Sequence, residues 1–282
     1  MTIAVIVLTI NNGYGASGSK SAYIIFTNGT IYINSGSAVT NLVVSGGAVA
    51  AYNVDPGSYP GASFVNLNGG VAYPGFHDSH DHLMEVGCVP PTAVNLSGCN
   101  NAAEIATNVA KHAQFVPAGK PVIGVDFSLA KLSNAWTLAD RDLLNQAGGG
   151  HEVMLMDNLG HNCIVNSAVM TNYNITATST VPLSGVIVAE NGQATGLLKE
   201  AAMLLCVQDI LSKMSDRDVF AETLLWLKVW ASFGYTSIND MMGLPGGRVM
   251  RPQLYAEMES QGVLPLRVNY ALTIEPISKV RF

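Results

Sequence analysis

The sequence predicts an α/β protein, and two observations carry that prediction. Residues 22–73 break into short apolar runs separated by turn residues, which is the pattern of a small antiparallel β unit. From residue 102 onward, helical periodicity alternates with short apolar runs, as in parallel β–α–β units. With 282 residues, the chain has room for one large domain or for a domain with an appendage.

Two glycine-containing turns organise the predicted β unit. Asn28-Gly29 and Gly46-Gly47 each separate two β-prone runs, so each predicts a hairpin. The runs are Ala22–Thr27 with Thr30–Asn34 and Leu42–Ser45 with Val49–Tyr52, followed by Ser63–Leu67 and Val71–Phe76.

Helical spacing predicts several helices beyond the β unit, with Asn101 as the expected N-cap of the first. They cover Ala102–Phe115, Thr137–Gln146, Gly196–Met214, Asp218–Phe233 and Arg251–Gln261. Short strands are expected between them at Pro121–Val125, Glu152–Met156, Tyr235–Ile238 and Pro265–Leu272.

Composition excludes some classes of partner and leaves the location open. Charged residues are 12% of the chain, against about 25% in an average soluble protein. The net charge of −6 and the absence of a Lys/Arg cluster with aromatics predict no nucleic-acid partner. No run reaches the roughly 18 apolar residues of a membrane span, so no membrane partner is expected. Residues 1–21 are either a tail with a first strand or the remnant of a secretion signal. Both a secreted and a cytoplasmic location therefore stay open.

The four cysteines give no metal motif. Because no C-x-x-C pair occurs, a structural zinc site is not expected. Cys88 and Cys99 are near enough in sequence for a disulfide if the protein is secreted.

The segment Tyr73–Leu83 holds the strongest chemical signal. On a strand, residues two apart share a face, so His80 and His82 can direct both imidazoles to one point, with Asp78 on the same face. Neutral imidazole suits Zn²⁺ and other first-row divalent ions. The alternative is a histidine-rich turn, or a surface pair that binds metal adventitiously.

The context of this pair matches a known family. The pattern Pro74-Gly75-Phe76-x-Asp78-x-His80-x-His82 is highly specific, and weaker landmarks follow it in order. These landmarks are Trp136-Thr137-Leu138, Asp140–Leu144, Gly160-His161, Asn166-Ser167, Gly192–Glu200, Gly234-Tyr235-Thr236-Ser237 and Leu266-Arg267-Val268. On these residues the chain resembles the amidohydrolase superfamily and, within it, the amidohydrolase family 3 branch.

The resemblance implies a fold and a chemistry. The implied fold is a partial (β/α)8 (TIM-like) barrel with a small β-sandwich unit. Residues 22–73 would form the sandwich unit, and residues 74–282 the first part of the barrel, with a long insertion at about 98–190. The implied activity is hydrolysis of C–N bonds other than peptide bonds, of amide or N-acyl type, in a small-molecule substrate. The implied cofactor is one or two divalent ions, of which Zn²⁺ is expected, acting through a metal-activated water.

Site roles follow from this resemblance for five residues. His80 and His82 are expected to bind the metal, and Asp78 to orient one of them. Asp240 ends a strand and is expected to act as third ligand or as acid–base group, with a helix N-cap as its alternative. His161 begins a loop after a strand and is expected to contact the substrate or polarise its carbonyl, with a structural histidine as its alternative.

The sequence departs from the family in one respect. Family members take two further histidine ligands from later strands, but all six histidines here lie at or before His161. Lys279, near the position of a family lysine, is not a firm candidate. The chain is therefore expected to stop near the middle of the barrel. Two hypotheses stay open: a metal-dependent amidohydrolase, or an incomplete half-barrel with a binding or assembly role, which forms a homodimer or needs a missing C-terminal half.

Overall fold

The computed structural model describes residues 22–132, 135–181, 184–241, 249 and 251–271, which form two compact units. The first unit contains residues 22–83, 224–241 and 252–271, and the second contains residues 84–223 together with 249 and 251. Residues 1–21 and Lys279, for which the sequence makes predictions, lie outside the described residues. None of the described helices has the length and apolar character that crossing a bilayer requires.

Two small sheets of the first unit enclose an apolar core. One has the strand order β5-β4-β1-β6 and the other β3-β2-β7. The strands are β1 (Ile24–Thr27), β2 (Thr30–Asn34), β3 (Ser37–Val39), β4 (Leu42–Ser45), β5 (Ala48–Tyr52), β6 (Ser63–Asn66) and β7 (Val71–Ala72), with a 3₁₀ turn η1 (Pro56–Ser58) before β6. The core between them consists of Phe26, Ile31, Val39, Leu42, Val44, Leu67 and Ala72.

One of the two predicted hairpins is confirmed and the other is wrong. β4 and β5 pair antiparallel around Gly46 and Gly47, whose φ angles of 57° and 82° suit a tight hairpin turn. β1 and β2 do not pair with each other across Asn28-Gly29, because they belong to different sheets.

Tertiary pairing overrides the turn signal at Asn28-Gly29. β1 pairs in parallel with β6, and β2 pairs in parallel with β7, so the chain changes sheet at this corner and again between β6 and β7. The two corners lie against each other, since Thr30 N–H donates to Gly70 O at 3.0 Å and a Cβ on Gly29 would lie 2.6 Å from the same oxygen. Here Asn28-Gly29 allows the backbone to approach Gly70 closely and does not form a hairpin turn.

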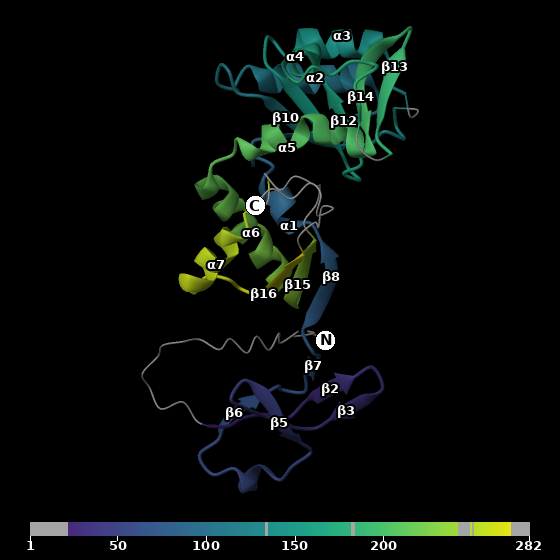
Figure 1. The fold of residues 1–282 in the computed structure, drawn as a ribbon. Helices are drawn as coiled ribbons and strands as arrows, with labels where there is room; N and C mark the ends of the chain where they lie inside the picture. The colour runs from purple at the N-terminus through teal and green to yellow at the C-terminus, as the bar shows by residue number, and fades with distance from the viewer. Residues whose placement is uncertain (1–21, 133–134, 182–183, 242–248, 250, 272–282) are drawn as a thin grey trace. The chain divides into compact units, whose positions relative to one another are not determined.

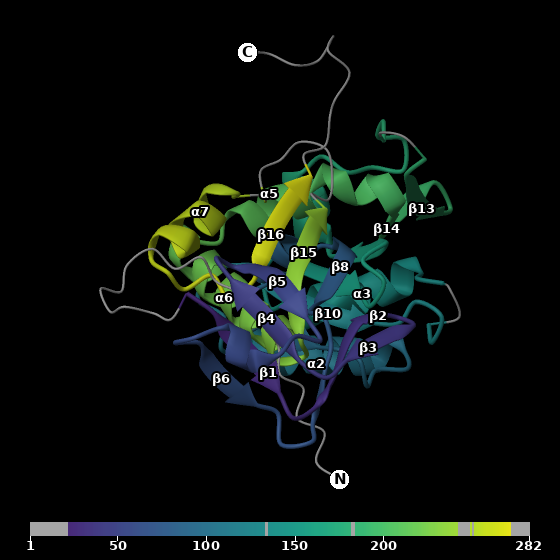
Figure 2. The ribbon, with the colours of Figure 1, turned by 90° about the horizontal axis from the view of Figure 1, so that it is seen from below.

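The first unit also contains a three-stranded parallel sheet of order β16-β15-β8, whose course can be followed in Figure 2. Its strands are β8 (Phe76–Asp81), β15 (Tyr235–Met241) and β16 (Arg267–Ala271). Helix α7 (Gln253–Ser260) connects β15 to β16 in sequence, and the helix α6 (Asp216–Ser232) precedes β15. The predictions of α6, β15, α7 and β16 are confirmed to within three residues at each end that the structure describes.

The second unit is built on a six-stranded mixed sheet of order β13-β14-β12-β11-β10-β9. Its strands are β9 (Val94–Asn95), β10 (Val122–Phe127), β11 (Val153–Asp157), β12 (Asn162–Val165), β13 (Val186–Glu190) and β14 (Gln193–Lys199). Its helical elements are α1 (Leu83–Gly87), α2 (Ala102–Ala113), α3 (Leu138–Ala147), α4 (Ser167–Asn172), η2 (Glu200–Leu205) and α5 (Val207–Ser212). Figure 1 shows α2, α3 and α4 together on one face of this sheet.

Only part of this sheet has the parallel order that the alternating pattern predicted. β9, β10 and β11 are parallel, whereas β11, β12, β14 and β13 are joined antiparallel. The α/β class is confirmed, and the sheets traced by the described strands are open rather than closed into a barrel.

The helix predicted over Gly196–Met214 is wrong in its first part. Gly196–Lys199 is the end of strand β14, and helix resumes only as η2 and α5. β14 lies between β13 and β12 and is buried along most of its length, so its apolar run carries no strand-type alternation. A short, fully buried strand cannot be separated from a buried helix by periodicity alone.

Helix caps follow the sequence closely in this unit. Asn101 accepts a hydrogen bond from the Glu104 N–H at 2.9 Å, which confirms the predicted cap of α2. Thr137 and Asp140 form a capping box at the start of α3, with Thr137 N–H donating to Asp140 Oδ2 at 2.9 Å.

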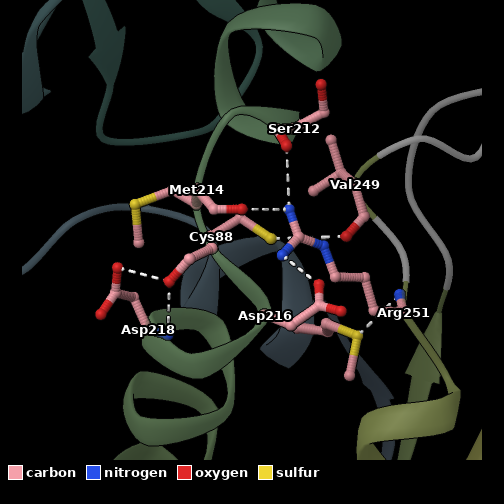
Figure 3. A network of polar contacts seen from close by, with 9 residues as sticks. Cys88, Ser212, Met214, Asp216, Asp218, Val249 and Arg251 are labelled. Atoms are coloured by element: carbon pink, nitrogen blue, oxygen red, sulfur yellow. Dashed lines mark hydrogen bonds and ion pairs between the residues drawn. The ribbon is translucent and has the colours of Figure 1, made fainter. Parts of the chain in front are cut away.

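A buried arginine holds three segments of the second unit together (Figure 3). The Arg251 side chain donates to Ser212 O at 3.1 Å and Met214 O at 2.8 Å. It also forms an ion pair with Asp216 at 2.8 Å, and its backbone N–H lies 3.1 Å from Met84 Sδ. The carbonyls of the last residue of α5 and of Met214 just beyond it therefore accept hydrogen bonds from a residue about 40 positions away in sequence.

All four cysteines are buried and none of them is in a disulfide, so the Cys88–Cys99 bond left open by the sequence is not formed.

Candidate metal centre

The entry into β8 depends on close contact with β15. A Cβ on Gly75 would lie 2.0 Å from Thr236 Cγ2, so only glycine fits at this position. The next residue, Phe76, donates its N–H to Gly234 O at 2.9 Å and begins the parallel pairing. The Pro-Gly-Phe element of the motif thus sets β8 against β15 before the histidines.

A bulge interrupts β8 where the site begins. Asp78 faces Ile238, but Asp81 faces Asp240, so three steps on β8 correspond to two on β15. The strict alternation assumed from the sequence is therefore broken between Asp78 and Asp81. Bulges commonly redirect side chains next to active sites.

His80 lies within this bulge and His82 directly follows β8, and the two side chains are close together. Their ring centroids are 5.1 Å apart and their planes meet at 77°. Both residues are exposed, so solvent and a metal ion can reach the imidazoles. The arrangement gives two imidazole donors at the carboxyl end of a parallel strand, the edge where α/β active sites form.

Two carboxylates brace the backbone of this pair. Asp78 Oδ1 accepts from the His80 N–H at 3.0 Å, and Asp81 Oδ1 accepts from the His82 N–H at 2.7 Å. The hydrogen bond of Asp78 is thus to the backbone of His80 and not to the imidazole ring. Both bonds hold the strand end in the conformation that brings the rings together.

Asp81 is a site residue that sequence reasoning did not single out. Burial raises the pKa of the Asp81 carboxyl, and the negative charge of Asp78 adds to the rise, while the hydrogen bond from the His82 amide opposes it. The bulge explains why it was missed, because alternation placed Asp81 on the face opposite to the histidines.

His77 takes a different role from its two neighbours. Its Nδ1 lies 2.8 Å from Ser237 Oγ on the adjacent strand. This cross-strand bond anchors β8 to β15 one pair before the bulge.

Asp240 is the penultimate residue of β15, close to the predicted strand end, but its carboxylate is hydrogen-bonded and buried. Its exposed fraction is 0%, and Tyr255 on α7 donates its hydroxyl to Asp240 Oδ2 at 2.6 Å. This contact makes Asp240 better placed to fix β15 against α7 than to bind a metal. Nothing in the sequence pattern linked Tyr255 to this carboxylate.

His161 lies in the second unit, between β11 and β12, and its Nδ1 is 2.9 Å from Glu200 Oε2. Glu200 is the first residue of η2. The structure therefore places His161 beside Glu200, and His80 beside His82.

The described residues fit a metal only in part. His80 and His82 supply two donors of a type that Zn²⁺ accepts. Among the residues that the structure describes, no group of three or more His, Cys, Asp or Glu side chains is arranged to hold an ion.

Comparison with known proteins places the chain in a family. The family-3 model of the amidohydrolases matches residues 63–281. N-substituted formamide deformylase of Arthrobacter pascens is 26% identical over 238 residues, which are 81% of this chain and 43% of that protein. The putative amidohydrolase YtcJ of Bacillus subtilis is 30% identical over 155 residues, 55% of this chain and 28% of that protein.

Solved structures agree with this assignment at the level of fold. An uncharacterized metal-dependent hydrolase of Pyrococcus horikoshii superposes with a TM-score of 0.60 and 21% identity, covering 89% of this chain and 48% of that one. Its counterpart from Pyrococcus furiosus gives 0.58 and 24%, covering 89% and 50%. The chain spans about half the length, or less, of these proteins. With a family model matching more than three quarters of its residues, this chain belongs to the amidohydrolase family.

Proposed function

We propose that this chain carries the first-strand metal ligands of a metal-dependent hydrolase that cleaves C–N bonds of amide or N-acyl type in small molecules. The observation that carries the proposal is the His80–His82 pair, with ring centroids 5.1 Å apart at the carboxyl end of β8. Family membership supports the C–N hydrolase class.

In this proposal His80 and His82 hold a divalent ion. Asp78 and Asp81 keep the strand end in its binding conformation by accepting hydrogen bonds from the backbone N–H groups of the two histidines. Zn²⁺ is the expected ion, because neutral imidazole is among its preferred ligands. When bound, one or two such ions supply an activated water and polarise the carbonyl that is attacked.

The proposed substrate class comes from a relative. The Arthrobacter pascens protein is named for its action on N-substituted formamides. We therefore take N-substituted formamides, and then longer N-acyl amines, as the first compounds to test on this chain.

Metal binding and turnover test the proposal together. The purified full chain, loaded with Zn²⁺ or Co²⁺ and then dialysed, should retain metal in an elemental assay and hydrolyse an N-substituted formamide. Replacing either ligand, His80→Gln or His82→Gln, should weaken metal binding at least tenfold, because even changes to the groups that support metal ligands cost about 10–100-fold.

The matched control is His112→Gln, on helix α2 of the second unit, which should leave metal content and turnover unchanged. Retention of stoichiometric metal by the His80→Gln/His82→Gln double variant would show that the ion is held elsewhere and would overturn the assignment.

A second candidate is a catalytically incomplete homologue with a binding or assembly role. The lack of a three-ligand group within the described part of the chain favours it. Open edges of parallel sheets invite pairing with another chain, and in the described sheet β8 and β16 are the edge strands. Metal retention without turnover, together with a dimeric mass in light scattering, would support this candidate over the hydrolase.

A further inference from the structure

The second unit gathers chemically active side chains at one edge of its six-stranded sheet. β10 and β11 are parallel and end there, β14 ends there, and β12 begins there. The carboxyl ends of parallel strands are where α/β sheets bind ligands. This edge carries Asp126, Asp157, His161 and Glu200.

Asp157 fixes the backbone of the loop that carries His161. Asp157 has an exposed fraction of only 6%, and its carboxylate accepts three hydrogen bonds. They come from His161 N–H at 2.9 Å, Asn162 N–H at 2.9 Å and Asn162 Nδ2 at 2.6 Å. A buried carboxylate with this many donors fixes the backbone of a loop that would otherwise be free to move.

Glu200, which contacts His161, has an unusual backbone conformation. Its φ angle is 52°, in the left-handed region that residues other than glycine rarely adopt. Its N–H donates to His161 O at 2.8 Å, and its carboxylate Oε2 lies 2.9 Å from His161 Nδ1. Strain of this kind persists where surrounding contacts enforce it, and it clusters at functional sites. Asp126, with a φ of 67°, is a second such residue on the same edge.

These contacts orient the imidazole. Nδ1 of His161 is hydrogen-bonded to Glu200, and Nε2 lies on the opposite side of the ring. The His161 side chain is 64% exposed. No described residue hydrogen-bonds to this Nε2. The hydrogen bond and the charge of Glu200 raise the pKa of His161, and Asp157 adds to the rise, so both ring nitrogens carry protons over a wider pH range than in a free histidine.

We propose that His161 binds the carbonyl oxygen of a neutral amide through its Nε2–H, with Glu200 as the positioning residue. The choice of an amide rests on the proposed hydrolase function. The choice of a neutral ligand rests on charge, because the carboxylates of Glu200 and Asp157 act on His161 and disfavour an anion there.

The test is a titration of the full chain, free of added metal, with N-benzylformamide, followed by NMR of the histidine ring protons. Without metal no turnover is required, so the result is independent of whether the chain is a hydrolase. The His161 resonance, identified by its loss in His161→Gln, should shift in a saturable manner, whereas that of His112 should not.

Glu200→Gln removes the charge that orients and protonates the ring. It should weaken amide binding about three- to tenfold, because the charge-assisted hydrogen bond to Nδ1 becomes a weaker, neutral one. It should also lower the pKa of His161. Binding should fall as the pH rises through this pKa, because Nε2 then loses its proton, and in Glu200→Gln the fall should come at lower pH.

Two further variants make the result decisive. Glu200→Asp keeps the charge but shortens the side chain, and it should weaken binding as Glu200→Gln does if positioning matters. Glu259→Gln, an exposed carboxylate on α7, should have no effect. A His161 resonance that does not respond to the amide, or an equal affinity in Glu200→Gln, would identify an ordinary surface ion pair and overturn the proposal. Binding at His161 without turnover of the metal-loaded chain would leave this inference standing and refute the hydrolase function.

Discussion

At the scale of single residues, two features of the H-x-H segment were decided by neighbours rather than by spacing. Gly75 is required because Thr236 occupies the place of a side chain. Asp81 joins the site because a bulge opposite β15 breaks the alternation of β8. The identity and proximity of His80 and His82 could be predicted from sequence, since two residues that are two apart cannot be separated far by any strand geometry.

The buried pair of Tyr255 and Asp240 gives a prediction at this scale. Tyr255→Phe removes the hydroxyl that donates to Asp240 Oδ2 at 2.6 Å and leaves a fully buried carboxylate with one donor fewer. We expect a loss of about 1–3 kcal/mol in the free energy of unfolding, measured by urea denaturation. Tyr270→Phe, at an exposed tyrosine of β16, is the matched control. Equal stability of the two variants would contradict a supporting role for the Asp240 contact.

At the scale of elements, helices with capping residues were predicted well, whereas strands depended on their neighbours. The starts of α2 and α3 follow from Asn101 and Thr137, because a cap is a local interaction within four residues. The end of β14, Gly196–Lys199, was misassigned as helix because the strand is buried along most of its length. The pairing of β1 was misassigned because its partners, β4 and β6, are distant in sequence.

The capping box of α3 gives the prediction at this scale. Thr137→Ala removes the hydroxyl that accepts from the Asp140 N–H at 3.2 Å, and should cost about 1 kcal/mol of unfolding free energy. Thr137→Ser keeps the hydroxyl and should retain most of the stability. A loss in Thr137→Ser as large as that in Thr137→Ala would assign the effect to the methyl group instead of the cap.

At the scale of the whole molecule, Arg251 shows how a single buried charge organises distant segments (Figure 3). Its side chain is 8% exposed and contacts the end of α5 and the start of α6. Arg251→Met should lower the unfolding free energy by about 2–3 kcal/mol, because the carbonyls of Ser212 and Met214 lose their donor.

Two variants separate the contributions of the ion pair and of the carbonyl contacts. Asp216 is 67% exposed, so Asp216→Asn should cost less than 1 kcal/mol. Arg217→Met, at the exposed neighbour, should stay within about 0.5 kcal/mol of the parent. A loss in Asp216→Asn equal to that in Arg251→Met, by chemical denaturation, would show that the ion pair carries the effect.

The sequence alone determined the α/β class, the family and the histidine pair, because each rests on local periodicity or on a motif of fewer than ten residues. Tertiary structure decided the sheet to which each strand belongs, the bulge that brings Asp81 to the site, the burial of Asp240 against Tyr255 and the contact of His161 with Glu200. These features depend on residues between 15 and 160 positions apart, and such pairs leave no periodic signal in a single sequence. The physical reason is that strand pairing and burial are set by what packs against a residue, and that partner is chosen by the whole fold.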